Sequence, residues 1–126
     1  MSGYFDGPGP EAVFRAYLGQ GRFMIQRSAS TGAHVFYPRL VAPGTGEADL
    51  EWVEASGAGT VHATTVNRRR SSRGGDFNVA LIDLAEGPRM MSRVVGIEPE
   101  AVTIGMKVRA RIDELNGAPA VLFEPV

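Results

Sequence analysis

The pattern of apolar and polar residues is β-like along most of this chain after residue 21, either as short β-rich runs or as alternation with a period of two. The clearest case is the segment 106–113, in which an apolar face alternates with a charged face. Shorter β-rich runs, separated by Gly and Pro, predict further strands at 22–27, 34–37, 50–54, 59–67, 77–84, 89–95 and 120–123. Several short strands with turn signals between them predict a mostly β protein, a small and largely antiparallel barrel or sandwich.

One segment near the N-terminus has a helical period instead. Pro10 and Glu11 suit the first turn of a helix, and Gly19 ends the pattern. The apolar residues between them, at helical spacing, are Val13, Phe14, Tyr17 and Leu18. This spacing predicts one short amphipathic helix whose aromatic stripe is a packing surface. A single helical turn is also expected at 99–102.

The composition narrows the class of protein. A chain of 126 residues fits one domain, and 13 Lys and Arg against 14 Asp and Glu give a net charge of −1. With this balance of charges, the protein has no net positive electrostatic field that would attract nucleic acid or anionic lipid. No apolar run is long enough to span a membrane, and the first eleven residues lack the regions of a secretory signal, so we expect a cytoplasmic protein. The absence of cysteine excludes disulfides, thiol catalysis and any Cys-ligated zinc site.

Catalytic and metal-binding motifs are missing from the sequence. His34 and His62 lie 28 positions apart without further ligands nearby, whereas a zinc site needs at least three protein ligands. There is no G-x-S-x-G elbow and no glycine-rich phosphate loop that opens a helix. We therefore predict no catalytic residue and no bound metal.

An arginine cluster is the one local anomaly of charge. Four arginines fall within six positions on a Gly- and Ser-bearing loop between two predicted strands: Arg68, Arg69, Arg70 and Arg73. Guanidinium groups donate paired hydrogen bonds to phosphate, so the cluster is a candidate site for a nucleotide-containing cofactor or a nucleic acid backbone. A solvated hairpin loop without a ligand is the alternative interpretation, and the sequence leaves both open.

Three short motifs, taken in their order along the chain, point to a known family. They are Trp52 followed by Ser56-Gly57-x-Gly59-Thr60-Val61, the segment Leu84–Gly87, and Ile104-Gly105-Met106-x-Val108. With these motifs the chain resembles, from about Pro10 to Pro125, the DUF35 family of zinc-ribbon and OB-fold proteins, which are small partners of thiolases and acyl-CoA hydratases.

The resemblance implies a fold and a division of the chain. It implies a lead-in and helix at 1–19, a rubredoxin-like ribbon at 20–48 and a five-stranded OB-fold barrel at 49–126. The family's two C-x-x-C pairs would fall on Ser28 with Thr31 and on Ala42 with Thr45. Hydroxyl and methyl groups do not replace four thiolates, so we expect a degenerate, zinc-free ribbon. Packing would then hold it, through Phe23, Ile25, Val35, Phe36 and Tyr37.

The resemblance also implies a function. The chain would be a non-catalytic accessory subunit that binds a thiolase, hydratase or aldolase-like partner and supports acyl-CoA binding or the stability of the complex. Acyl-CoA would be a ligand held by the arginine loop, with no covalently bound cofactor. Apolar residues expected on the helix and ribbon would suit an interface in a homo- or hetero-oligomer. One alternative is an OB fold that binds single-stranded nucleic acid, although the net charge of −1 and the aromatic content of 8% argue against it. Another alternative is a protein–protein adaptor that binds no ligand.

Overall fold

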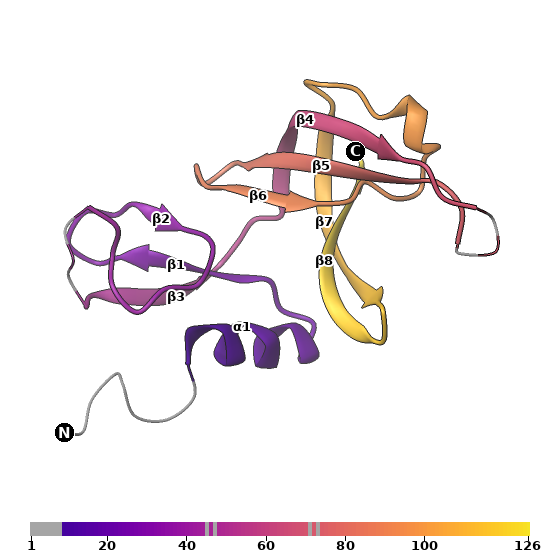
Figure 1. The fold of residues 1–126 in the computed structure, drawn as a ribbon. Helices are drawn as coiled ribbons and strands as arrows, with labels where there is room; N and C mark the ends of the chain where they lie inside the picture. Colours follow the sequence, from indigo (N-terminus) through magenta and orange to yellow (C-terminus); the bar gives the residue numbers. More distant parts are fainter. Residues whose placement is uncertain (1–8, 45, 47, 71, 73) are drawn as a thin grey trace.

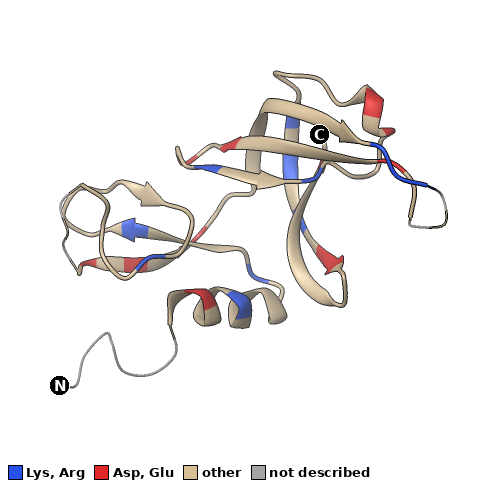
Figure 2. Ribbon diagram, viewed as in Figure 1, with Lys and Arg blue, Asp and Glu red and all other residues tan. Residues whose placement is uncertain are grey.

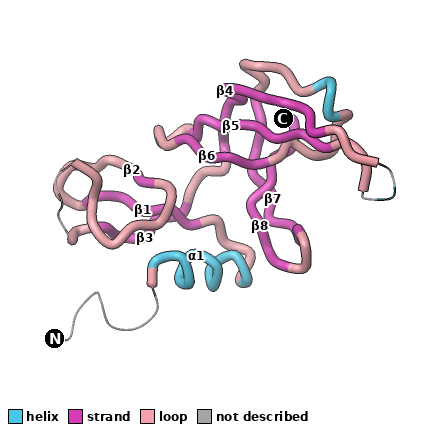
Figure 3. Tube along the Cα trace, viewed as in Figure 1, coloured by secondary structure: helices cyan, strands magenta, loops and turns pink. Residues whose placement is uncertain are grey.

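The structure, a computed structural model, describes residues 9–44, 46, 48–70, 72 and 74–126. One α-helix precedes a series of β-strands, and a single 3-10 turn lies between β6 and β7 (Figures 1 and 3). The elements are α1 (Pro10–Gly19), β1 (Met24–Ser28), β2 (His34–Val35), β3 (Leu50–Glu54), β4 (Ala58–Asn67), β5 (Phe77–Leu84), β6 (Arg89–Ser92), η2 (Pro99–Ala101), β7 (Lys107–Leu115) and β8 (Ala118–Pro125). The prediction of a mostly β protein with one short helix is confirmed.

The strands form two antiparallel sheets. The first is three-stranded in the order β2-β1-β3, and the second is five-stranded in the order β6-β5-β4-β7-β8. The second sheet curls until its two edges meet, where Val94 and Phe123 form a parallel bridge. The Val95 amide donates to the carbonyl of Phe123 at 2.7 Å, and the Phe123 amide donates to the carbonyl of Arg93 at 2.9 Å. The five-stranded sheet is therefore a closed barrel with the OB-fold strand order.

Strand β4 serves both halves of the barrel because it bends. It pairs with β5 along its length and with β7 at Ala58–Thr60, and its register shifts between Val61 and Ala63. A β-bulge of this kind increases local curvature. Close packing also requires a glycine at position 59, where an added Cβ would lie 2.7 Å from Cγ2 of Ile82.

The ribbon and helix share one apolar core with the barrel. Leu18, Phe23 and Ile25 belong to the same buried cluster as Ile82 and Phe123. Three rings join α1 to the ribbon in edge-to-face pairs, with centroids 5.4 to 6.5 Å apart, from Phe14, Phe23 and Phe36. Such pairs each contribute about 0.5–1.5 kcal/mol beyond area burial.

The residues predicted to hold the ribbon take different positions. Phe23, Ile25 and Val35 are buried, Phe36 packs against the core as a partly buried ring, and Tyr37 remains 52% exposed. The division at 48/49 stays a prediction, while in the structure β3 belongs to the ribbon sheet, because it pairs with β1 from Met24 to Ser28. Within the described part of the chain, no helix has the length and apolar character needed to cross a membrane.

Candidate functional site

The positions expected for zinc ligands carry a hydrogen-bond network instead. Ser28 is 1% exposed, and its hydroxyl donates to Oδ2 of Asp49 at 3.0 Å. The same carboxylate oxygen accepts the backbone amide of Ser30 at 2.9 Å, while the Thr31 amide donates to Oγ of Ser28 at 3.3 Å. Asp49 directly precedes β3 and thereby ties the turn after β1 to the start of β3. The sequence did not predict this role.

Ala42, at a further expected ligand position, has a methyl side chain that offers no donor for a metal. Ala42 is buried with 3% exposure, and Thr45 lies outside the described residues. Hydrogen bonds from Ser30, and in smaller measure from Ser28, hold the pKa of Asp49 below its usual range. Among residues 9–44, 46, 48–70, 72 and 74–126, no group of three or more His, Cys, Asp or Glu side chains is placed to hold a metal ion. The chemistry at this site therefore does not fit a zinc ion.

A buried amide braces the long loop of the ribbon. The side chain of Gln26, 4% exposed, donates to the carbonyl of Arg39 at 2.7 Å and accepts the amide of Arg39 at 2.7 Å. This paired contact imitates the hydrogen bonding of a neighbouring strand. It fixes the loop that carries Tyr37 beside the barrel.

The predicted arginine loop divides into members with different surroundings. Arg68 forms ion pairs with Asp76 at 2.7 Å and with Glu100 at 2.5 Å. The side chain of Asp76 is the main cause of the raised pKa of Arg68 and also bonds the backbone amide of Arg69. Arg68 therefore holds the loop against β5 and η2. Arg70 is exposed, and Arg73 lies outside the described residues.

Arg69 lies beside an arginine that the sequence did not single out. The guanidinium carbon of Arg69 is 4.3 Å from the centroid of the Phe77 ring. The guanidinium carbon of Arg93 is 4.0 Å from the same centroid. Burial, and then the charge of Arg69, lower the pKa of Arg93. Among the ion pairs between described residues, neither of these two arginines has a carboxylate partner. In the described part of the chain, two cations thus contact one aromatic ring and neither side chain forms an ion pair.

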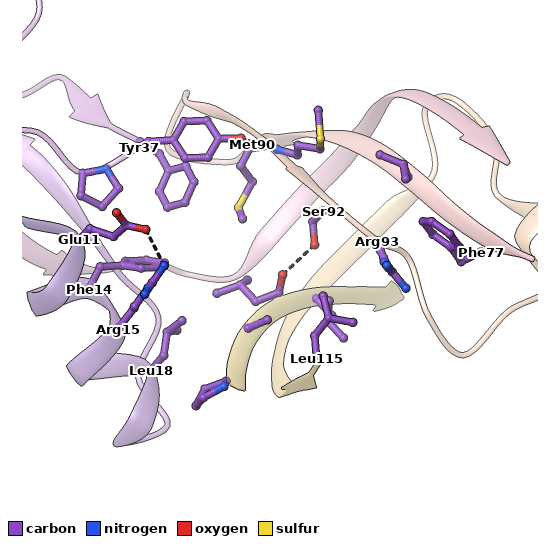
Figure 4. A pocket seen from close by; sticks show the side chains of 18 residues that line it. Glu11, Phe14, Arg15, Leu18, Tyr37, Phe77, Met90, Ser92, Arg93 and Leu115 are labelled. Carbon is purple, nitrogen blue, oxygen red and sulfur yellow. Dashed lines mark hydrogen bonds and ion pairs between the residues drawn. The ribbon is translucent and has the colours of Figure 1, made fainter. Parts of the chain in front are cut away.

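A groove of about 560 Å³ leads from this ring toward the helix (Figure 4). We call it the α1–β8 groove. Its walls come from α1, from the ribbon segment 36–38, and from the facing parts of β5, β6 and β8. Its lining is mostly apolar, and its charged members are Glu11, Arg15 and Arg93. Glu11 and Arg15 form an ion pair at 2.8 Å on the helix, so Arg93 supplies the net charge of the lining.

The ribbon and barrel meet across this groove. The Met91 amide donates to the hydroxyl of Tyr37 at 3.2 Å, and both side chains are more than half exposed. Ser92 donates to the carbonyl of Val121 at 2.7 Å, which joins β6 to β8 in the floor. The α1–β8 groove therefore has a braced wall and floor with apolar side chains open to solvent.

In the described segments, neither histidine lies with a hydroxyl group as the base and nucleophile of a catalytic pair would. Nδ1 of His62 lies 3.4 Å from Asp83, whose other carboxylate oxygen accepts a hydrogen bond from Arg89 at 2.6 Å. Arg89 is the main cause of the lowered pKa of Asp83. Within the described residues, the hydrogen-bond pattern joins neither histidine to a serine or threonine hydroxyl. This arrangement gives no support for acid–base or nucleophilic catalysis.

Comparison with known proteins agrees with the barrel and with the ribbon. The family described as "ChsH2, C-terminal OB-fold domain" matches residues 52–113. A "DUF35 domain-containing scaffold protein" of Methanothermobacter thermautotrophicus is 31% identical over 98 residues, which cover 69% of this chain and 74% of the relative. A solved chain from "Ltp2-ChsH2(DUF35) aldolase" superposes with a TM-score of 0.81 at 30% identity, covering 94% of this chain and 96% of that one.

A longer relative matches only in part. The "Probable enoyl-CoA hydratase alpha subunit" of Thermomonospora curvata is 35% identical over 91 residues. The match covers 71% of this chain and 28% of the relative, so the chain spans little more than a quarter of that protein. The scaffold protein and the solved chain, by contrast, match over 74% and 96% of their own length. This chain therefore belongs to the DUF35 family.

Proposed function

We propose that this protein is a non-catalytic accessory subunit that binds a thiolase-, hydratase- or aldolase-like partner and supports acyl-CoA binding in the complex. One observation carries the proposal: the likeness over nearly the whole length to a DUF35 chain of an aldolase. The name of the hydratase alpha subunit, which includes a matching segment, points to the same chemistry. Among the described residues, neither histidine is joined to a hydroxyl group and no cluster of His, Cys, Asp or Glu is placed for a metal, which supports a partner that supplies the reacting groups.

The arginine loop is the proposed contact for the phosphates of coenzyme A. Arg69 and Arg70 are the described members that the loop leaves available, because Arg68 is engaged by Asp76 and Glu100. Arg73 belongs to the same predicted set. Guanidinium groups bind phosphate oxygens in pairs, and the 3′-phosphate and diphosphate of coenzyme A provide such oxygens.

Single-stranded nucleic acid binding has weaker support. The exposed positions of β7 include Lys107, Arg109 and Arg111, and Figure 2 colours the Lys and Arg positions of the ribbon blue. Arg109 and Arg111 both pair with Glu124, and Arg111 also pairs with Asp113. These carboxylates neutralise much of the positive charge that would be needed to bind the phosphates of a nucleic acid. A gel shift with single-stranded oligonucleotides, repeated at rising salt, tests this alternative.

Co-purification tests the proposed function. The tagged chain, expressed at native level in its host, should retain an acyl-CoA hydratase, aldolase or thiolase in near-equimolar amount, identified by mass spectrometry. Reconstitution from the separately purified proteins should then raise the turnover of the partner or its affinity for its CoA ester. Capture of no acyl-CoA enzyme, or a partner whose turnover ignores this chain, would contradict the proposal.

Alanine variants test the arginine loop in the reconstituted complex. Replacing Arg68, Arg69, Arg70 and Arg73 together should weaken CoA-ester binding by about tenfold or more, since charge-assisted hydrogen bonds contribute roughly 1.5–3 kcal/mol each. Arg109→Ala is the matched control, because this arginine pairs with Glu124 on β7. Equal affinity for all three proteins would remove the loop from the CoA site.

A further inference from the structure

The α1–β8 groove has the properties of a small-molecule site. Its volume of about 560 Å³ lies within the ~300–1,000 Å³ of typical ligand pockets, which are mostly apolar with a few convergent polar groups. The exposed apolar surface is concentrated at Met91, 58% exposed, and at the ring of Tyr37. An apolar ligand would remove this surface from water, at about 25 cal/mol per Å².

The charge at one end selects the kind of ligand. Arg93 lines the groove, and Arg69 lies on the same Phe77 ring. Their mutual repulsion and the partial burial of Arg93 disfavour the two positive charges. An anion at this end would offset both effects, whereas a cation would add to the repulsion. At the other end, the ion pair of Glu11 with Arg15 leaves no net charge.

We propose that the α1–β8 groove binds the apolar chain of an amphipathic anion whose acidic group lies against Arg93, at the end of the groove where Arg69 adds its positive charge. The inference deepens the proposed function, on which its biological meaning rests, because it assigns apolar contact to this chain and adds Arg93 to the anion site. The shared chemistry, an apolar chain that ends in an anion, is found in a free fatty acid and in a fatty acyl-CoA.

A pair of matched fluorescent probes tests the site on the full chain alone. The first probe is 11-(dansylamino)undecanoate, and the second is its methyl ester, which keeps the apolar body and lacks the charge. We expect saturable, one-to-one binding of the acid with about tenfold or higher affinity than the ester. The inference would be overturned by an absence of saturable binding, which is expected if the groove instead binds a protein partner. Equal affinity for both probes would also overturn it.

Variants separate the two parts of the site. The double variant Arg69→Gln/Arg93→Gln should lose the preference for the acid and keep the affinity for the ester. Met91→Glu should weaken both probes, because it places a carboxylate on the exposed apolar wall. Arg109→Gln on β7 is the matched control and should bind like the native chain. Circular dichroism and melting temperature show that each variant is folded, and a folded Met91→Glu that binds normally would contradict the assignment.

Competition identifies the source of the ligand. Displacement of the probe by decanoate supports a free acid, and displacement by decanoyl-CoA but not by decanoate supports the CoA ester. Coenzyme A that displaces the probe as well as decanoyl-CoA does would show that the groove contributes nothing, and would overturn the inference. Probe binding is measured without any partner, so it is independent of partner capture. If the chain captures an acyl-CoA enzyme but binds no probe, the proposed function stands and this inference is refuted. If the chain binds the probe but captures no such enzyme, the groove site stands and the proposed function is refuted.

Discussion

The hydroxyl of Ser28 donates a hydrogen bond to the carboxylate of Asp49 across 3.0 Å, at a position where the resemblance to zinc-ribbon proteins implies a thiolate. Asp49 lies 21 positions away in the sequence and holds the turn after β1 through this bond and the amide of Ser30. A side-chain network inside the ribbon thus occupies the place of a metal centre. Its stability should follow the protonation of Asp49.

The ribbon should loosen in acid. Because the folded-state pKa of Asp49 is lowered, its hydrogen bonds contribute stability at pH values above its unfolded pKa, and this contribution is lost as the pH falls through the folded value. The relevant window lies below about pH 4. Trp52, the one tryptophan, lies in β3 and reports on the ribbon by its fluorescence.

Asp49→Asn should remove this part of the acid response and lower the melting temperature at neutral pH. Asp113→Asn in β7 is the control, because its carboxylate is exposed and pairs with Arg111. The lowered pKa values of Asp76 and Asp83 add their own acid sensitivity, which should persist in Asp49→Asn. An unchanged Trp52 acid titration in Asp49→Asn would contradict the role of this carboxylate.

The folded chain should be independent of zinc. Structural zinc supplies folding free energy to ribbons that contain it, so a chelator unfolds them. Here Ser28 and Ala42 offer no thiolate, and we expect EDTA to leave the melting temperature unchanged. Elemental analysis should find far less than one zinc per chain. One zinc per chain that resists dialysis would refute this expectation.

Asn78 should be critical for the barrel. Its side chain, 2% exposed, accepts the amide of Val94 at 3.1 Å and donates to Oγ1 of Thr64 on β4. Asn78→Ala leaves the Val94 amide without this partner and opens a cavity, at a cost of about 2–4 kcal/mol in the free energy of unfolding. Urea unfolding measures this loss. The exposed Asn67→Ala should change stability by less than about 0.5 kcal/mol, and equal effects of the two would contradict the assignment.

Gly59→Ala should strain the bend of β4. The new methyl group would lie 2.7 Å from Ile82 and 3.7 Å from Phe123, so the core must shift, at a cost of about 1–3 kcal/mol. Gly19→Ala is the control, because nothing lies within 4 Å of its added Cβ. That change at the end of α1 should be neutral or slightly stabilising. Thermal unfolding of both variants compares them, and an equally stable Gly59→Ala would show that the barrel does not need this close approach.

Local patterns predicted a strand well where the strand buries one face, as β5 and β7 do. The alternation of burial in β5, whose residues are half-buried and buried in turn, is the kind of pattern that predicts a strand from sequence. Strand ends were less accurate, since the predicted 89–95 strand ends at Ser92. There the chain leaves β6 and reaches β8, through the bridge of Val94 with Phe123. A contact between residues so far apart has no local signature.

The candidate site was harder to predict for the same reason. The loop arginines were visible as a cluster, but one of the two ion pairs of Arg68 is with Glu100, 32 positions away. Arg93 carried no signal because it is a lone cation in an apolar run. Only the fold places it on Phe77 beside Arg69. The hydrogen-bond network of Asp49 could not be predicted either. The family pattern locates the positions of the missing zinc ligands, but no sequence motif describes the hydrogen bonds that stand in their place.

The contact of α1 with β8 has a consequence for the order in which the protein is built during synthesis. The helix leaves the ribosome long before β8, so Leu18 and Phe14 lack the barrel wall that β8 forms until that strand emerges. Ribbon and helix can pack early through Phe23 and Phe36, whereas the α1–β8 groove is completed only once β8 has emerged. A nascent chain that stalls before Ala118 would present this apolar helix face to chaperones.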